Sequence, residues 1–108
     1  MSYKVEFTSV AIDNLRNITL TILDLSNDKQ IAINYVKGIK EKTDILKDFP
    51  EIGPIVKDRN LISKGYRFLT YKKYVIFYSV NKDIETVYIH TIINSRMNYT
   101  KALREILR

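Results

Sequence analysis

The sequence predicts an α+β domain in which an antiparallel helical hairpin packs on one face of an antiparallel sheet. In the first half, apolar residues recur every three or four positions, as in amphipathic helices. In the second half, β-branched and aromatic residues form short runs separated by turn-forming residues. At 108 residues the chain has the size of one domain, residues 1–108, and the expected order of elements is β-α-α-β-β-β-α.

The first half is predicted to hold one strand and two helices. Residues 3–7 alternate between apolar and polar side chains, which is typical of a short strand. Thr8 or Ser9 can cap the helix that follows, and Asp28 can cap a second helix after a break at 26–28. The apolar stripe of the first helix is Leu15, Ile18, Ile22 and Leu25. The stripe of the second is Ile31, Tyr35, Ile39, Ile45 and Leu46.

The second helix is expected to end in the segment 48–54, because a residue that precedes proline is disfavoured in a helix. A loop then reaches to about Asn60. Short strands are predicted at 61–63 and 66–69, and residues 71–73 are expected to form a turn into the next strand.

Two longer strands and a last helix complete the prediction. Residues 74–80 are apolar on both faces, which indicates a central strand. After an Asn/Asp-type turn at 81–83, residues 86–93 are again β-branched and aromatic, and Asn94 ends that strand. Apolar residues at helical spacing predict a short C-terminal helix over 98–107.

Positive charge is concentrated in the second half of the chain. Residues 1–58 carry eight Lys/Arg and nine Asp/Glu, whereas residues 59–108 carry ten and three. Residues 59–108 therefore carry a net charge of +7, whereas residues 1–58 carry −1, which gives +6 for the whole chain. Such a surface is suited to the phosphate backbone of a nucleic acid or to an acidic protein partner.

Composition excludes several classes of site. The sequence has no cysteine, which excludes disulfides, a thiol nucleophile and cysteine-based zinc sites, and its single histidine offers little for metal catalysis. We therefore expect no metal and no cofactor. No apolar run approaches the roughly 20 residues that span a bilayer, and no signal peptide is evident, so we expect no membrane contact and a cytoplasmic location.

Short motifs follow one another in a characteristic order over nearly the whole chain. They are DFPEIG at 48–53, GYRFL at 65–69, YVIFYSV at 74–80, VYIH at 87–90 and SRMNY at 95–99. In this order and spacing the chain resembles the RelE/ParE superfamily of toxins from type II toxin–antitoxin modules. The resemblance implies a small basic toxin that is neutralised by an antitoxin, and we expect the antitoxin to cover the basic half.

The resemblance leaves two targets open. RelE-like members enter the ribosomal A site and cleave messenger RNA, whereas ParE-like members act on DNA gyrase and lack ribonuclease activity. The sequence favours a ribosome-dependent, metal-independent endoribonuclease slightly, and whether the chain is an enzyme stays open. The alternatives are a gyrase inhibitor, in which the C-terminal helix with Arg104 and Arg108 matters, and an inactive relative that only binds antitoxin.

Two arginines are the first candidates for RNA cleavage, which needs a base, a proton source and cations for the phosphoryl oxygens. By the resemblance, Arg67 occupies the position of an arginine that RelE-like members place against the scissile phosphate. Arg96 lies where members commonly carry a basic residue, and its guanidinium can hold a phosphate through two hydrogen bonds. We predict that they converge on one face of the sheet. The structural alternatives are a salt bridge or an antitoxin clamp for Arg67 and a strand cap for Arg96.

The acid and base are harder to assign. Many relatives carry histidine two residues before the equivalent of Arg96, but this chain has Asn94, which exchanges no proton near neutral pH. The single histidine, His90, is expected to share a strand face with Tyr88, Ile92 and Asn94, and it can serve as a base if that face is open. Tyr99 can stack on a base, take part in proton transfer, or simply anchor the last helix.

Further basic and polar residues are candidates for binding nucleic acid, although solvated turn residues are the alternative for the lysines. They are Lys64, Lys72, Lys73, Asn94, Lys101 and Arg104.

Overall fold

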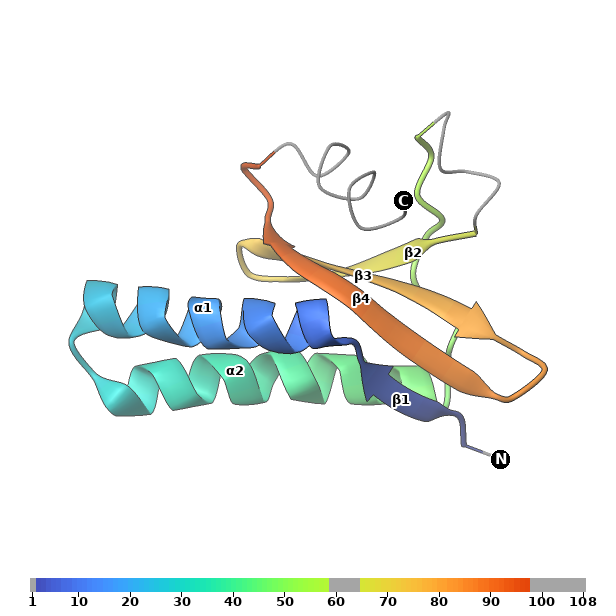
Figure 1. Cartoon of the computed structure of the whole chain (residues 1–108), viewed down its shortest axis with the longest axis horizontal. Coiled ribbons are helices and arrows are strands. Elements are labelled where there is room, and N and C mark those ends of the chain that lie inside the picture. Colours follow the sequence, from blue (N-terminus) through green and yellow to red (C-terminus); the bar gives the residue numbers. More distant parts are fainter. Residues whose placement is uncertain (1, 59–64, 98–108) are drawn as a thin grey trace.

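The computed structural model describes residues 2–58 and 65–97. Its elements are β1 (Lys4–Phe7), α1 (Ser9–Ser26), α2 (Lys29–Asp44), the short 3₁₀ helix η1 (Ile45–Lys47), β2 (Arg67–Tyr71), β3 (Tyr74–Asn81) and β4 (Thr86–Asn94). The two helices form a hairpin beside a four-stranded sheet (Figure 1), which confirms the α+β class. The strand predicted at 61–63 and the helix predicted at 98–107 lie outside the described residues.

Local capping interactions set the helix boundaries where the sequence predicts them. The Thr8 side chain accepts a hydrogen bond from the Ala11 N–H at 3.2 Å, which caps α1. Asn27 ends α1 with φ of 56°, a left-handed conformation that asparagine tolerates. The Asp28 carboxylate accepts from the N–H groups of Gln30 and Ile31, which caps α2.

The sheet has the order β1-β4-β3-β2, with β3 in the interior as predicted. β2, β3 and β4 pair antiparallel, but β1 pairs with β4 in parallel, with Lys4 opposite Thr86 and Phe7 opposite Ile89. The prediction of a wholly antiparallel sheet is therefore wrong at this edge. A tight turn dictates antiparallel pairing only between strands that it joins, and β1 and β4 are separated by most of the chain.

The main core lies between the hairpin and one face of the sheet. Its buried members include Leu15, Ile18, Ile39, Leu46, Ile76, Tyr78, Val87 and Ile89. Leu25 and Ile31, predicted for the buried stripes, are 80% and 48% exposed, because the end of the hairpin extends beyond the sheet (Figure 1). Ile45 is 42% exposed because it lies in η1, where the tighter winding changes the helical phase. Neither described helix is long and apolar enough to cross a membrane.

The opposite face of the sheet carries a second, smaller apolar cluster. Val56, Phe77 and Ile93 are buried in it, and Tyr66, Phe68 and Val75 pack around them. The segment before β2 lies along the β2 edge, where the Val56 N–H donates to the Tyr66 carbonyl at 2.8 Å. We call this side, away from the helices, the open face.

Candidate functional site

A β-bulge in β4 determines which side chains reach the open face. Phe77 lies opposite Thr91, but the next residue of β3, Tyr78, lies opposite Ile89. His90 is therefore an extra residue in β4. Beyond a bulge the alternation of side chains between the two faces is shifted, and bulges often redirect a functional side chain.

The bulge separates residues that simple alternation places together. Tyr88 lies opposite Ser79 and near the His90 ring, so both point to the open face. Ile92 belongs to the main core, and Asn94 lies opposite the core residue Tyr74, so both point to the helix side. The prediction that His90 shares a face with Ile92 and Asn94 is therefore wrong.

The start of α1 holds this part of β4 in place. β1 ends opposite Ile89, which leaves the following edge of β4 without a strand partner. The Thr8 hydroxyl donates to the His90 carbonyl at 3.0 Å, and the Ile92 N–H donates to the Asn14 side-chain oxygen at 2.9 Å. These contacts replace the missing strand and fix the bulge.

His90 lies in a polar and aromatic niche on the open face. Its Nε2 is 2.6 Å from the Ser79 Oγ, and the Tyr66 ring meets the imidazole edge-on with 5.1 Å between centroids. Burial lowers the pKa of His90, so the imidazole is neutral at pH 7. A neutral imidazole hydrogen-bonded to a hydroxyl is chemically able to accept a proton.

We predict that His90 makes stability depend on pH. Its folded-state pKa lies below the unfolded value of 6.5, so the unfolded chain binds more protons between these two values. Stability should be fully present above about pH 6.5 and should fall as the pH drops from there toward the folded-state pKa. Denaturant unfolding between about pH 7.5 and 5 measures this slope, and His90→Asn should reduce it. An unchanged slope in His90→Asn would contradict the assignment.

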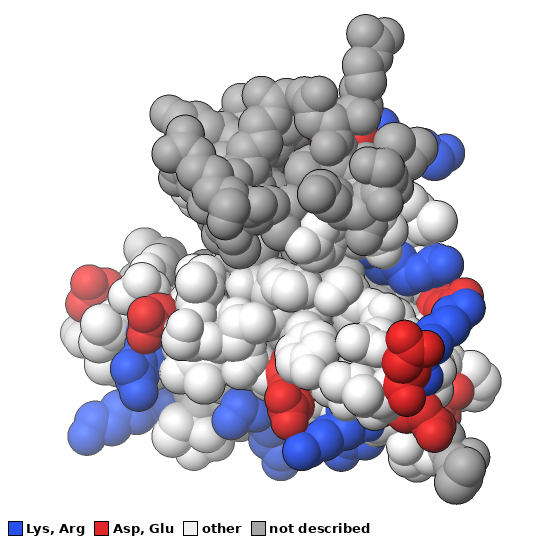
Figure 2. All heavy atoms as spheres, turned by 45° about the vertical axis from the view of Figure 1, so that its right-hand side comes forward, with Lys and Arg blue, Asp and Glu red and all other residues white. Residues whose placement is uncertain are grey.

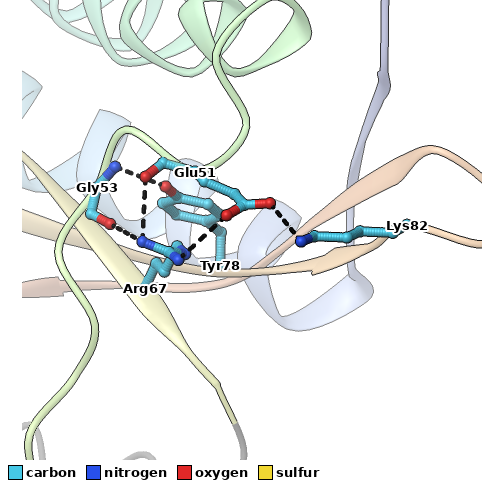
Figure 3. Close-up of polar contacts among 5 residues, drawn as sticks. All are labelled: Glu51, Gly53, Arg67, Tyr78 and Lys82. Atoms are coloured by element: carbon cyan, nitrogen blue, oxygen red, sulfur yellow. Dashed lines mark hydrogen bonds and ion pairs between the residues drawn. The ribbon is translucent and has the colours of Figure 1, made fainter.

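Arg67 forms part of a network that fastens the loop after η1 to the sheet (Figure 3). Its Nη1 donates to the carbonyls of Glu51 at 3.0 Å and Gly53 at 2.8 Å, and its Nη2 is 3.5 Å from the Glu51 carboxylate. The other Glu51 oxygen is 2.8 Å from Lys82 Nζ, and the Tyr78 hydroxyl accepts from the Gly53 N–H at 2.9 Å. We call these five residues the Arg67 lock.

Both the charges and the close packing of its residues suit the Arg67 lock to hold the loop against the sheet. The hydrogen bond and charge of Lys82 lower the pKa of Glu51, with a smaller contribution from Arg67, while burial raises the pKa of Tyr78. A Cβ at Gly53 would lie 2.4 Å from the Phe68 carbonyl oxygen and 2.7 Å from the Tyr78 hydroxyl. Glycine is thus required for the loop to approach the strands this closely.

The structure does not bring Arg67 and Arg96 together, contrary to the prediction. Arg67 pairs with Tyr78 and points to the helix side, whereas Asn94, just before the turn that carries Arg96, pairs with Tyr74. Four residues of β3 separate these positions, roughly 13 Å along the strand. Arg96 lies exposed in that turn, where its N–H donates to the Asn94 side chain at 3.0 Å.

Two of the other predicted residues, Lys72 and Lys73, lie in the turn between β2 and β3. Lys72 Nζ lies 4.9 Å from the ring centre of Tyr35, a cation–π contact with α2. Lys73 is exposed, and its carbonyl accepts from the Ser95 N–H. Lys64, Tyr99, Lys101 and Arg104 lie outside the described residues. The described part of the chain contains no group of three or more His, Asp or Glu arranged to hold a metal.

The sequence prediction missed Glu51, Ser79 and Asn14. Glu51 is 16 positions from Arg67, and Ser79 is 11 from His90, so no short motif joins either pair. Asn14 offered no signal because its partners on β4 are 77 and 78 positions away.

Residues 5–99 match the family model described as the ParE toxin of the type II toxin–antitoxin system parDE. The chain belongs to the ParE toxin family. This confirms the RelE/ParE superfamily resemblance for a span that contains every described strand and helix except the first residue of β1. No curated protein matches the chain.

Solved structures of related toxins have the same fold as this ParE-family chain. The chromosomal ParDE toxin–antitoxin system of P. aeruginosa aligns with 19% identity over 86% of this chain and 96% of the other, with a TM-score of 0.71. A double mutant of the E. coli toxin RelE in the free state aligns with 17% identity over 98% and 99%, with a TM-score of 0.65. The RelBE2 toxin–antitoxin complex of Mycobacterium tuberculosis gives 18% identity over 87% and 99%, with a TM-score of 0.59.

Proposed function

We propose that this ParE-family toxin arrests growth by binding a protein target, DNA gyrase, and not by cleaving messenger RNA. The observation that carries the proposal is the Arg67 lock. Cations that stabilise a phosphoryl transition state must direct free donors at its oxygens. The Arg67 guanidinium instead donates to two backbone carbonyls and pairs with the Glu51 carboxylate, and the Arg67 side chain is only 21% exposed.

The position of Asn94 supports the same choice. It occupies the slot where many relatives carry histidine, and it points to the helix side beside α1. Arg67 and Asn94, the two positions that the resemblance assigns to RNA cleavage, thus make hydrogen bonds within the fold of this chain. This reverses the slight preference for a ribonuclease drawn from sequence.

Membership of the ParE family implies a cognate antitoxin, and two of the similar solved structures are toxin–antitoxin systems. We infer that the toxin works in the cytoplasm as one half of such a module. A net charge of +6 suits both an acidic antitoxin and an acidic target surface.

RNA cleavage is the second candidate, and His90 is the observation that favours it. The bulge places a neutral imidazole on the open face, hydrogen-bonded to Ser79 and beside Tyr66. There it can take a proton from a ribose hydroxyl while Tyr66 or Tyr88 contacts a base. Arg96, which is exposed in the turn after β4, is then available for phosphate.

Purified toxin should inhibit supercoiling by gyrase and leave messenger RNA intact on programmed ribosomes. His90→Asn should keep wild-type inhibition of gyrase under this proposal. Messenger cleavage that falls by about 100-fold or more in His90→Asn would instead establish the ribonuclease and overturn the proposal. Activity in neither assay, with antitoxin still bound, would identify an inactive relative.

A further inference from the structure

Two turns meet at the end of the sheet where β3 begins and β4 ends. Lys72 and Lys73 form the turn between β2 and β3, and Arg96 lies in the turn that follows β4. The Ser95 N–H donates to the Lys73 carbonyl at 2.7 Å, which joins the two turns. Figure 1 shows both turns at the same end of the sheet. We call Lys72, Lys73 and Arg96 the basic end.

No described carboxylate forms an ion pair with the basic end. Between positions 65 and 97 the sequence has two acidic residues, Asp83 and Glu85, and both lie in the turn between β3 and β4 at the other end of the sheet. The eight residues of β3 place these ends roughly 24 Å apart. Figure 2 brings the side of the β3–β4 turn forward and shows Asp and Glu side chains beside Lys and Arg there. The two ends of the sheet therefore differ in charge.

Lys72 is held in place at a conformational cost. Its φ of 52° is left-handed, a conformation that two-residue hairpin turns usually give to glycine or asparagine. Its Nζ lies 4.9 Å from the ring centre of Tyr35 and 5.6 Å from that of Tyr71. These cation–π contacts restrict the ammonium group, so binding a carboxylate there loses little side-chain entropy. Strained residues of this kind cluster at binding sites.

A cavity of about 430 Å³ adjoins the basic end, between α1 and the strands β3 and β4. Asn94 and Met97 line it beside the turn of Arg96, and Ile18 lines it from α1. Met97 is 58% exposed, so the cavity has an accessible apolar wall. Such a cavity can receive an aliphatic side chain, a group that a protein partner supplies and a phosphate backbone does not.

We propose that the basic end binds an acidic surface of the toxin's protein target, while an apolar side chain of that target enters the adjoining cavity. This inference rests on the proposed inhibition of gyrase and names the surface that makes the contact. His90 lies four positions before Asn94 in β4, roughly 13 Å along the strand, so this contact is separate from the niche on the open face. Complementary charge speeds association and fixes the orientation of the partner.

Charge reversal tests the basic end. Lys73→Glu/Arg96→Glu should weaken the binding of purified gyrase, measured without DNA, by about tenfold or more and should reduce its salt dependence. Lys40→Glu/Lys57→Glu is the matched control, because it changes the net charge equally at two exposed lysines outside the basic end. Its binding should stay within about threefold of the wild type. Thermal melting checks that each variant is folded.

Filling the cavity tests its role separately. Asn17 of α1 is exposed and lines the cavity, so Asn17→Trp places a large side chain in it. Gyrase binding should fall by about fivefold or more. Asn34→Trp makes the same change at an exposed position of α2 outside the cavity and should stay within about twofold. Wild-type binding by Asn17→Trp would overturn the assignment of the cavity.

The outcomes separate this inference from the proposed function. If wild-type toxin neither binds nor inhibits gyrase, the proposed function fails and this inference fails with it. If it does both and the charge-reversed variant behaves as the wild type, only the basic end is misassigned. A loss of binding that appears only when DNA is present would identify the basic end as a phosphate contact and would overturn its assignment to a protein surface. Messenger cleavage on programmed ribosomes that the double variant loses would do the same.

Discussion

Replacing Ile39 with alanine is expected to lower the free energy of unfolding by about 2–5 kcal/mol. Ile39 is completely buried in the core between the hairpin and the sheet. The substitution removes apolar contacts and leaves a cavity that the packed strands and helices fill only in part. Urea unfolding followed by circular dichroism measures the change.

Ile33→Ala is the matched control for this prediction. It makes the same substitution in the same helix at a side chain that is 56% exposed, so the change should stay within about 0.5 kcal/mol. Equal losses in the two variants would show that the hairpin packs on the sheet through a different face.

Arg67→Ala is expected to destabilise the fold by about 1.5–3 kcal/mol, so any loss of toxicity should follow the loss of stability. The guanidinium supplies donors to the carbonyls of Glu51 and Gly53, which lose these partners in the variant. The ion pair with the Glu51 carboxylate adds little, because that side chain is 46% exposed. Arg67→Lys should also destabilise the fold, since one ammonium cannot reproduce the two-carbonyl geometry.

Urea unfolding and growth arrest, measured on the same variants, distinguish a structural role of Arg67 from direct contact with phosphate or target. Arg96→Ala is the control, because Arg96 is exposed and lies outside the lock, and its stability should change by less than about 0.5 kcal/mol. Wild-type stability together with abolished growth arrest in Arg67→Ala would instead make this residue a contact to phosphate or target.

The lock also explains part of the motif pattern that marks the family resemblance. Glu51 and Gly53 come from the DFPEIG segment, Arg67 from GYRFL and Tyr78 from YVIFYSV. In the structure these segments meet in one network. These three motifs therefore supply the residues that attach the loop after η1 to the sheet. That attachment is a property of the fold and is independent of the target.

The sequence by itself determined the elements whose causes are local. As predicted, Thr8 and Asp28 cap the two helices and Asn27 ends the first of them. The apolar run at 74–80 forms an interior strand, also as predicted. Each of these signals acts over a few residues through capping, turn conformation or side-chain periodicity. The buried members of the helix stripes, such as Leu15 and Ile39, follow from the same periodicity.

Only the tertiary structure decided the features that depend on distant partners. The parallel pairing of β1 with β4, the hydrogen bonds of Arg67 to a loop 14 to 16 positions away, and the meeting of Lys73 with the turn of Arg96 have no local signal. The bulge at His90 is the clearest case, because one extra residue in β4 reverses the faces of Ile92 and Asn94. Strand alternation has a period of two, so a single inserted residue exchanges core and surface, and only the packing of β4 against β3 and α1 determines where it is inserted.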